Sequence, residues 1–240
     1  MRKAGQRSRI PHSLRCWPWL CLLGIAAATG CATVPTPSSE DRLARVAVLA
    51  MLQTLNADLL SHDSATLMLE RWCNDHHLAE PARISARRVR DEVKPVPADL
   101  RARLAVDAGE TLGYRHVQLM CGEHVLSEAD NWYVPSRLTA EMNRQLDSTD
   151  EPFGKVVKPL GFQRRTLSAE LLWSPLLSGW EMPAAAVAVE PLRIPHAVLQ
   201  HEAILYTSAQ LPFSAVVETY TNQLFDFGEW AAYRIRDETY

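Results

Sequence analysis

The stretch YRHVQLMCGEHVLSEADNWY, residues 114–133, decides the fold. In residues 114–121, one alternating set of side chains is Arg115, Val117, Leu119 and Cys121, and the other set is more polar. Residues 125–133 are predicted to form a second strand, and Gly122-Glu123 between the two is typical of a tight turn. Because successive side chains of a strand point to opposite faces, the pattern predicts an antiparallel hairpin.

Outward from this hairpin, apolar residues at helical spacing predict a helix over 41–61, and Asp63-Ser64 are natural caps for a second helix. Short helices are expected at 99–104 and 139–146. Further strands are expected within 82–97, 160–172, 203–207 and 213–224. Helices come early and antiparallel strands late, which predicts an α+β domain over 40–240 with a central antiparallel sheet covered by helices.

The N-terminus has the composition of a secretion signal. Residues 1–30 carry five Lys or Arg, no acid, and an apolar run of about a dozen residues, which is shorter than the roughly 20 that a membrane-spanning helix needs. The cut region Ala28-Thr29-Gly30-Cys31 resembles a bacterial lipobox. We expect Cys31 to carry lipid, with 31–39 as a tether to the envelope, in the outer membrane if the cell is Gram-negative. The alternative is ordinary cleavage that leaves Cys31 a free thiol.

The body that follows is acidic. Without the signal, 20 Lys and Arg stand against 28 Asp and Glu, a net charge near −8. This balance argues against nucleic acid as a partner. The membrane is expected to be reached through the lipid alone.

Two predicted strands each carry one charged residue on a face whose other side chains are mostly apolar. Arg115 shares its face with Val117 and Leu119, and Glu218 shares its face with Val216 and Tyr220. If these faces are buried, each charge needs a partner or a ligand, because an isolated buried charge costs several kcal/mol. If they face solvent, each charge is simply hydrated.

Four short motifs resemble the chorismate pyruvate-lyase family in their order. They are Asp63-Ser64-Ala65-Thr66, the strand from Tyr114-Arg115 to Cys121, Pro152-Phe153-Gly154, and Val217-Glu218-Thr219. The block over 126–138 resembles a related bacterial branch of the same superfamily. The resemblance covers nearly the whole body and implies a single α+β domain around a buried pocket.

What the resemblance implies for function is an elimination of pyruvate from chorismate, or from a related enol ether. The product from chorismate is 4-hydroxybenzoate, the entry to ubiquinone, and no metal or organic cofactor is required. Carried over by position, the substrate contacts are Ala65, Arg115, Phe153 and Glu218. Arg115 would hold a carboxylate, and Glu218 would act as an acid.

Because chorismate is made in the cytoplasm and this chain carries an export signal, two other hypotheses stand beside the lyase. One is a membrane-anchored binder of a small aromatic carboxylic acid that does not turn its ligand over. The other is a structural envelope lipoprotein. Arg164-Arg165 is either a second anion contact or a solvated strand edge, and Asn131-Trp132-Tyr133 is either core or the mouth of the pocket.

Two cysteines remain in the body, Cys73 and Cys121. In an oxidising compartment an even pair indicates a disulfide. Two buried free thiols are the first alternative. The second is a zinc site with His76 and His124, since each cysteine is followed by a histidine three positions later.

Overall fold

The computed structural model describes residues 38–90, 93–182, 188 and 190–235 of the chain, and they belong to one unit that spans 35–240. The expected secretion signal over 1–30, Cys31 and most of the tether lie outside the described residues.

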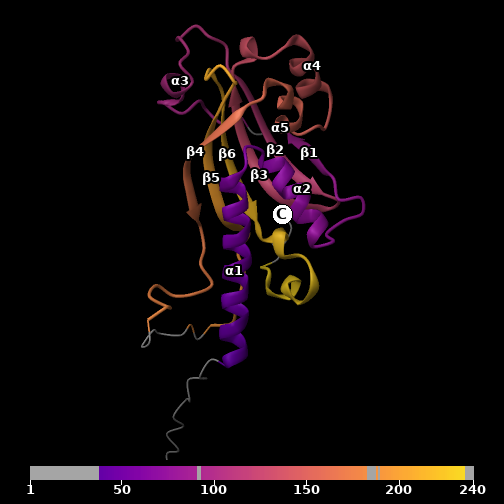
Figure 1. Ribbon diagram of the computed structural model, residues 1–240, viewed down its shortest axis with the longest axis vertical. Coiled ribbons are helices and arrows are strands. Elements are labelled where there is room, and N and C mark those ends of the chain that lie inside the picture. Colours follow the sequence, from indigo (N-terminus) through magenta and orange to yellow (C-terminus); the bar gives the residue numbers. More distant parts are fainter. Residues whose placement is uncertain (1–37, 91–92, 183–187, 189, 236–240) are drawn as a thin grey trace, which may run out of the picture. The chain divides into compact units, whose positions relative to one another are not determined.

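A six-stranded sheet forms the centre, in the order β1-β2-β3-β6-β5-β4, and every neighbouring pair is antiparallel. The fold class is therefore α+β, as the sequence predicts. The strand bounds are β1 Ile84–Val89, β2 Gly113–Cys121, β3 His124–Tyr133, β4 Gln163–Leu171, β5 Ala197–Tyr206 and β6 Pro212–Thr221. Figure 1 shows the strands side by side, with the long helix α1 in front of them.

Five α-helices accompany the sheet in the described part of the chain: α1 Ser39–Ser61, α2 Ala65–Asp75, α3 Leu100–Arg103, α4 Ala140–Ser148 and α5 Phe153–Val156. Short 3-10 turns cover Pro135–Arg137, Lys158–Leu160, Asn222–Phe225 and Gly228–Tyr233. The side chains of Ser38, Ser64 and Thr139 accept backbone N–H groups at the starts of α1, α2 and α4. These caps satisfy donors that a helix start otherwise leaves unpaired, which explains where the helices begin.

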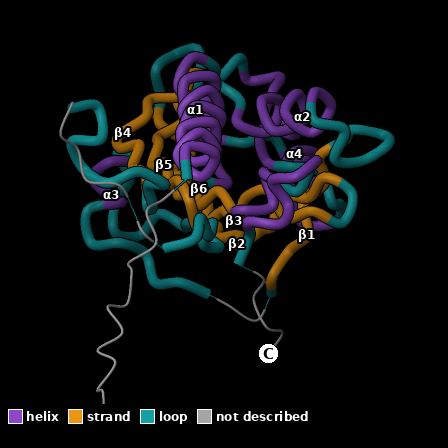
Figure 2. Tube along the Cα trace, turned by 90° about the horizontal axis from the view of Figure 1, so that it is seen from below, coloured by secondary structure: helices purple, strands orange, loops and turns teal. Residues whose placement is uncertain are grey.

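Helices α1, α2 and α4 lie on one side of the sheet (Figure 2), which we call the inner face. Leucines of α1 such as Leu52 and Leu55 share a buried cluster with Tyr220 of β6 and Leu119 of β2. On the outer face, Leu100 and Leu104 at α3 pack with Trp132. The strand alternation in the sequence thus corresponds to a helix-covered face and a thinly covered one.

Helix α1 is also the one helix in the described ranges that meets the length and composition of a membrane span. In the fold it is a packed helix, because Val48, Leu52, Leu55 and Leu59 are buried against the rest of the domain. A buried core helix can have the same length and apolar composition as a membrane-spanning helix.

β4 begins at Gln163 rather than at 160, and two further strand ends also differ from the predicted ones. β5 begins at Ala197 rather than at 203, because its polar residues are held by hydrogen bonds to both neighbouring strands. β6 ends at Thr221, three residues before the predicted end at 224. The hydroxyl of Thr221 accepts the N–H of Gln223 and caps a 3-10 turn, which ends the strand.

A disulfide joins Cys73 of α2 to Cys121 of β2, which are 48 positions apart in sequence, with 6.3 Å between the Cα atoms. It attaches α2 to the end of the hairpin. The disulfide expectation is met, and the two sulfurs are not available as the thiolate ligands of the zinc alternative.

Candidate functional site

A cavity opens between the inner face of the sheet, the start of α2 and α5. Its volume is about 50 Å³, well below the roughly 300 to 1,000 Å³ of typical small-molecule pockets, so a ligand with an aromatic ring requires the lining side chains to move apart. Its polar lining comes from Asp63, Ser64, Thr66, Asn131, Arg164 and Glu218, and its apolar lining from Ala65, Val117, Leu119, Ala129, Phe153, Gly154, Phe162, Leu205 and Val216.

A buried ion pair lies in this cavity. A guanidinium nitrogen of Arg164, on β4, donates to Oε2 of Glu218, on β6, over 2.6 Å, and the two side chains are only 4% and 8% exposed. Burial is the largest single influence and acts to lower the pKa of Arg164, but the charge and hydrogen bond of Glu218, together with Tyr220 and Asp63, outweigh it, so the pKa of Arg164 is raised. The guanidinium therefore stays charged, and the pair can hold a polar group that enters the cavity.

The pair has further buried neighbours. Tyr220 donates its hydroxyl to the same Oε2 over 3.2 Å, and burial followed by the charge of Glu218 raises the pKa of Tyr220 well above its usual value. His201 lies opposite Glu218 in the β5–β6 ladder. Burial, with the charge of Arg164 second, lowers the pKa of His201 to about 4. His201 is therefore neutral at pH 7.

The start of α2 supplies the opposite wall. Asp63 accepts the backbone N–H of Arg164 over 2.8 Å, which holds β4 against the helix start. Ser64, Ala65 and Thr66, at the first turn of α2, line the cavity. Because a helix start presents free N–H groups and a partial positive charge, this wall favours an acceptor or an anion.

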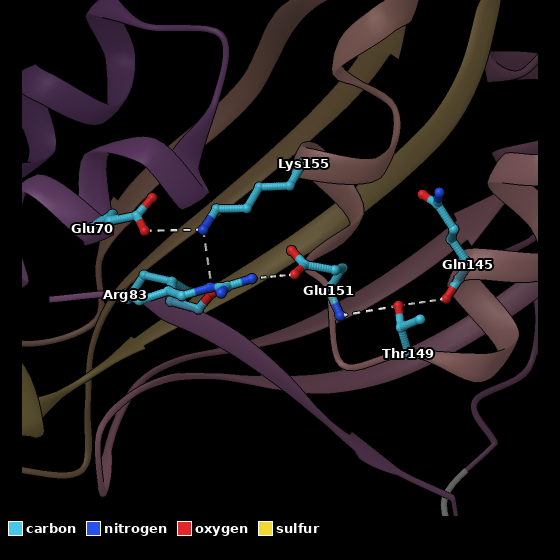
Figure 3. Close-up of polar contacts among 7 residues, drawn as sticks. Glu70, Arg83, Gln145, Thr149, Glu151 and Lys155 are labelled. Atoms are coloured by element: carbon cyan, nitrogen blue, oxygen red, sulfur yellow. Dashed lines mark hydrogen bonds and ion pairs between the residues drawn. The ribbon is translucent and has the colours of Figure 1, made fainter. Parts of the chain in front are cut away.

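Close contact between α5 and α2 depends on Gly154. A Cβ at this position would lie 3.3 Å from the hydroxyl of Thr66 and 3.4 Å from that of Ser64. The two helices are also joined by Lys155 of α5, which pairs with Glu70 of α2 over 3.0 Å (Figure 3). The glycine of the Pro152-Phe153-Gly154 motif thus keeps Phe153 close to the first turn of α2.

Arg115 lies beside the cavity and not in it. Its residue is 2% exposed, and none of its three guanidinium nitrogens has a hydrogen-bond partner among the described residues. It is paired across the ladder with Asn131 and is two positions from Val117, both of which line the cavity. Burial, and then the charge of Arg88, lower the pKa of Arg115 to about 10.

The structure brings together three of the four predicted contacts, namely Ala65, Phe153 and Glu218. Arg115 and Glu218 share the inner face, but the ion-pair partner of Glu218 is Arg164. The two arginines that the sequence treats as one candidate are separated, because Arg165 points to the outer side and lies over the ring of Tyr206, 4.3 Å from its centroid.

The three residues of the segment 131–133 also lie in different parts of the fold. Asn131 lines the cavity and accepts the hydroxyl of Ser214 over 2.6 Å, whereas Trp132 belongs to the outer face. Tyr133 packs with the residues of α4 and α5. Of the three, only Asn131 is available to a ligand in this cavity.

Sequence reasoning did not identify His201. Its signal was present, since His201 alternates with Leu199 and Ala203 on a buried face, but a single histidine on such a face is more often structural. Its Nε2 lies 2.8 Å from the side-chain oxygen of Asn56 on α1. In the described ranges, no group of three or more His, Cys, Asp or Glu residues is placed to hold a metal ion.

No family model matches the chain. A protein of Sinorhizobium fredii, described as uncharacterized protein y4mC, is 53% identical over 188 residues, which cover 77% of this chain and 79% of that protein.

Solved structures give weaker likenesses. PhnF from Mycobacterium smegmatis matches 85% of this chain and 92% of its own, at 10% identity and a TM-score of 0.44. A GntR-family transcriptional regulator from Enterococcus faecalis matches 60% of this chain and 98% of its own, at 14% identity and a TM-score of 0.37. A possible transcriptional regulator, YydK from Bacillus subtilis, matches 60% of each chain, at 16% identity and a TM-score of 0.35, so this chain spans about three fifths of it.

Proposed function

We propose that this chain, which belongs to the family of the Sinorhizobium fredii protein y4mC, is a binding protein for a small aromatic carboxylate. The ligand would lie in the cavity between the inner face of the sheet, α2 and α5. Its ring would contact Phe153 and Val117, its carboxylate would be directed past Asn131 toward Arg115, and its other polar end would meet Arg164 and Glu218.

The buried and unpartnered guanidinium of Arg115 is the observation that carries this proposal. A buried charge without hydrogen bonds costs several kcal/mol, and a bidentate carboxylate is the group that a planar guanidinium binds best. Arg115 lines a separate hollow with Arg88 and Asp147. Its link to the cavity is through its neighbours Asn131 and Val117, so the proposal requires the ligand carboxylate to pass Asn131.

The other end of the cavity suits a hydroxyl group. Both side-chain hydrogen bonds to Glu218 converge on Oε2, and no described residue donates to Oε1. A ligand hydroxyl can donate to Oε1 while it accepts from Arg164, whose Nε is buried without a partner among the described residues. A carboxylate at one end and a hydroxyl at the other describe a hydroxybenzoate.

Calorimetric titration of the full chain with 4-hydroxybenzoate at pH 7 tests the proposal. We expect saturable binding that Arg115→Met weakens at least about tenfold, the loss expected for a charge-assisted hydrogen bond. Arg87→Met is the matched control, because Arg87 is exposed on the neighbouring strand β1. Absence of binding, or equal effects of the two substitutions, would overturn the proposal.

Elimination of pyruvate from chorismate is the second candidate. It is favoured by one observation, the convergence of Ala65, Phe153 and Glu218 on one cavity. Against it, Glu218 accepts hydrogen bonds from Arg164 and Tyr220, which suits an ionised acceptor better than a proton donor. Incubation of the chain with chorismate distinguishes the two candidates, because only a lyase releases pyruvate and 4-hydroxybenzoate in equal amounts.

We further propose that the protein is exported and anchored through lipid on Cys31. Support comes from the Cys73–Cys121 disulfide, since disulfides form and persist mainly in oxidising compartments. The intact mass of the protein purified from its own membranes tests this proposal. A mass that includes residues 1–30, or lacks the acyl chains, would contradict it.

A further inference from the structure

The outer face of the sheet carries a second hollow, which we call the outer groove. Its volume is about 280 Å³. Its floor is formed by strands β3, β5 and β6, and one wall is formed by α3 and the segment before it. The residues that matter for its chemistry are Leu100, Trp132, Leu167, Glu202, Ala215 and Val217.

An unsatisfied donor lies in this groove. Trp132 is 5% exposed, and its indole N–H is buried without an acceptor among the described residues. Indole N–H groups usually find a partner when buried, because a buried donor without an acceptor is destabilising. The indole N–H of Trp132 is therefore free to donate to a ligand acceptor.

An uncompensated negative charge lies in the same groove. Glu202 is half-buried on the outer face of β5, and no hydrogen bond or ion pair joins its side chain to another described residue. The neighbouring charges of the groove, Asp99 and Arg103, pair with each other over 2.7 Å. Nearby Asp130 is satisfied by Lys94, Tyr114 and His116. Glu202 is thus the acid that a ligand cation would meet.

The strand register gives the spacing of these two groups. Trp132 is paired with Ala215 on β6, and Glu202 is paired with Val217 on the same strand. The donor and the acid therefore lie two strands apart and are separated by the small and apolar side chains of Ala215 and Val217. Half-exposed Leu167 adds apolar surface at the open side.

We infer that the outer groove is a second ligand site, for a small aromatic amine that carries a hydroxyl or carbonyl oxygen. The oxygen would accept from Trp132, the ring would lie on Ala215 and Val217, and the ammonium group would pair with Glu202. The site is on the opposite face of the sheet from the cavity of Arg164 and Glu218 and takes a cation, so it does not depend on the proposed carboxylate site.

Nuclear magnetic resonance of the full chain with two matched probes tests this inference. Tyramine has a phenol and an ammonium group, and tyrosol replaces the ammonium with a hydroxyl. Comparison with Trp132→Phe identifies the indole N–H signal of Trp132. We expect tyramine to shift this signal and to bind at least about tenfold more tightly than tyrosol, since the charged hydrogen bond is present only in tyramine.

Two substitutions of the same kind separate the site from general charge effects. In Glu202→Gln the preference for tyramine should vanish, whereas Glu170→Gln, an exposed glutamate on neighbouring β4, should keep it. The inference fails if the Trp132 signal does not move with tyramine, if tyrosol binds equally well, or if both glutamate variants behave alike.

Discussion

The guanidinium of Arg164 and the carboxylate of Glu218 form a buried pair 2.6 Å long between strands that are not neighbours, since β5 lies between β4 and β6. The pair bridges across the strand that carries His201. Its members are 54 residues apart in sequence. One contact therefore connects the edge of the sheet to its centre on the face where the cavity lies.

Removal of one member of this pair should be costly. We expect Arg164→Met and Glu218→Leu each to lower the free energy of unfolding by about 3 to 5 kcal/mol, because each leaves a buried charge without its partner. The double variant should lie within about 1 to 2 kcal/mol of the natural chain, since both charges are gone. Urea denaturation measures the free energy of unfolding of the two single variants and the double variant.

An exposed pair provides the comparison. Arg71 and Asp75 on α2 are 3.6 Å apart and 61% and 54% exposed. Arg71→Gln should change the free energy of unfolding by less than about 1 kcal/mol. If Arg164→Met costs no more than this control, the buried pair does not hold β4 in place.

His201 should make the fold sensitive to mild acid. Its pKa is near 6.5 in the unfolded chain and about 4 in the fold, because burial, and then the charge of Arg164, disfavour its protonated form. A depressed pKa contributes stability that is complete above pH 6.5 and is lost as the pH falls toward 4. The loss should reach roughly 2 to 3 kcal/mol at pH 4.

Measurement of the free energy of unfolding of His201→Gln as a function of pH separates the contribution of His201 from that of the carboxylates. The difference in free energy of unfolding between the natural chain and the variant should shrink steadily from pH 7 to pH 4. A constant difference over this range would show that His201 does not titrate differently in the folded and unfolded chain.

The disulfide should be a major part of the stability. It closes a loop of 48 residues, for which the chain-entropy model gives about 4 kcal/mol. A reducing agent should therefore lower the free energy of unfolding by an amount of this order. The variant with Cys73→Ala and Cys121→Ala should be as unstable without the agent and insensitive to it, and a reduction effect that persists in this variant would be unrelated to the disulfide.

The sequence predicts the hairpin over 114–133 and the helix starts well, because both depend on local patterns. Alternation defines the two faces of β2, and Ser64 and Thr139 are capping residues whose signal lies within one turn of the helix. β5 is less predictable. Gln200, His201 and Glu202 interrupt its apolar pattern, and what makes this segment a strand is the hydrogen bonding of β4 and β6 on both sides.

The candidate site is predicted in part for the same reason. The inner face of Glu218 follows from alternation within β6, but its partner depends on the order of the strands, which no local pattern encodes. Alternation also separates Asn131 from Trp132, so a strict application of the rule predicts that only one of them faces the cavity. The direction of the Arg115 side chain along its strand depends on packing with distant elements.

Arg115 should favour ligand binding at the expense of stability. Its guanidinium is buried, lies near the charge of Arg88, and has no hydrogen bond to a described residue, so the fold without ligand bears a desolvation cost that the charges of Asp147 and Asp150 offset only in part. Replacing such a group by an apolar side chain of similar length removes this desolvation cost. We therefore expect Arg115→Met to raise the free energy of unfolding while it weakens the binding of 4-hydroxybenzoate. Denaturation with and without the ligand measures both effects: at the same ligand concentration the natural chain should gain more stability than the variant. A variant that loses stability without ligand would show that Arg115 is a structural residue with partners of its own, and the carboxylate site would then have to lie elsewhere.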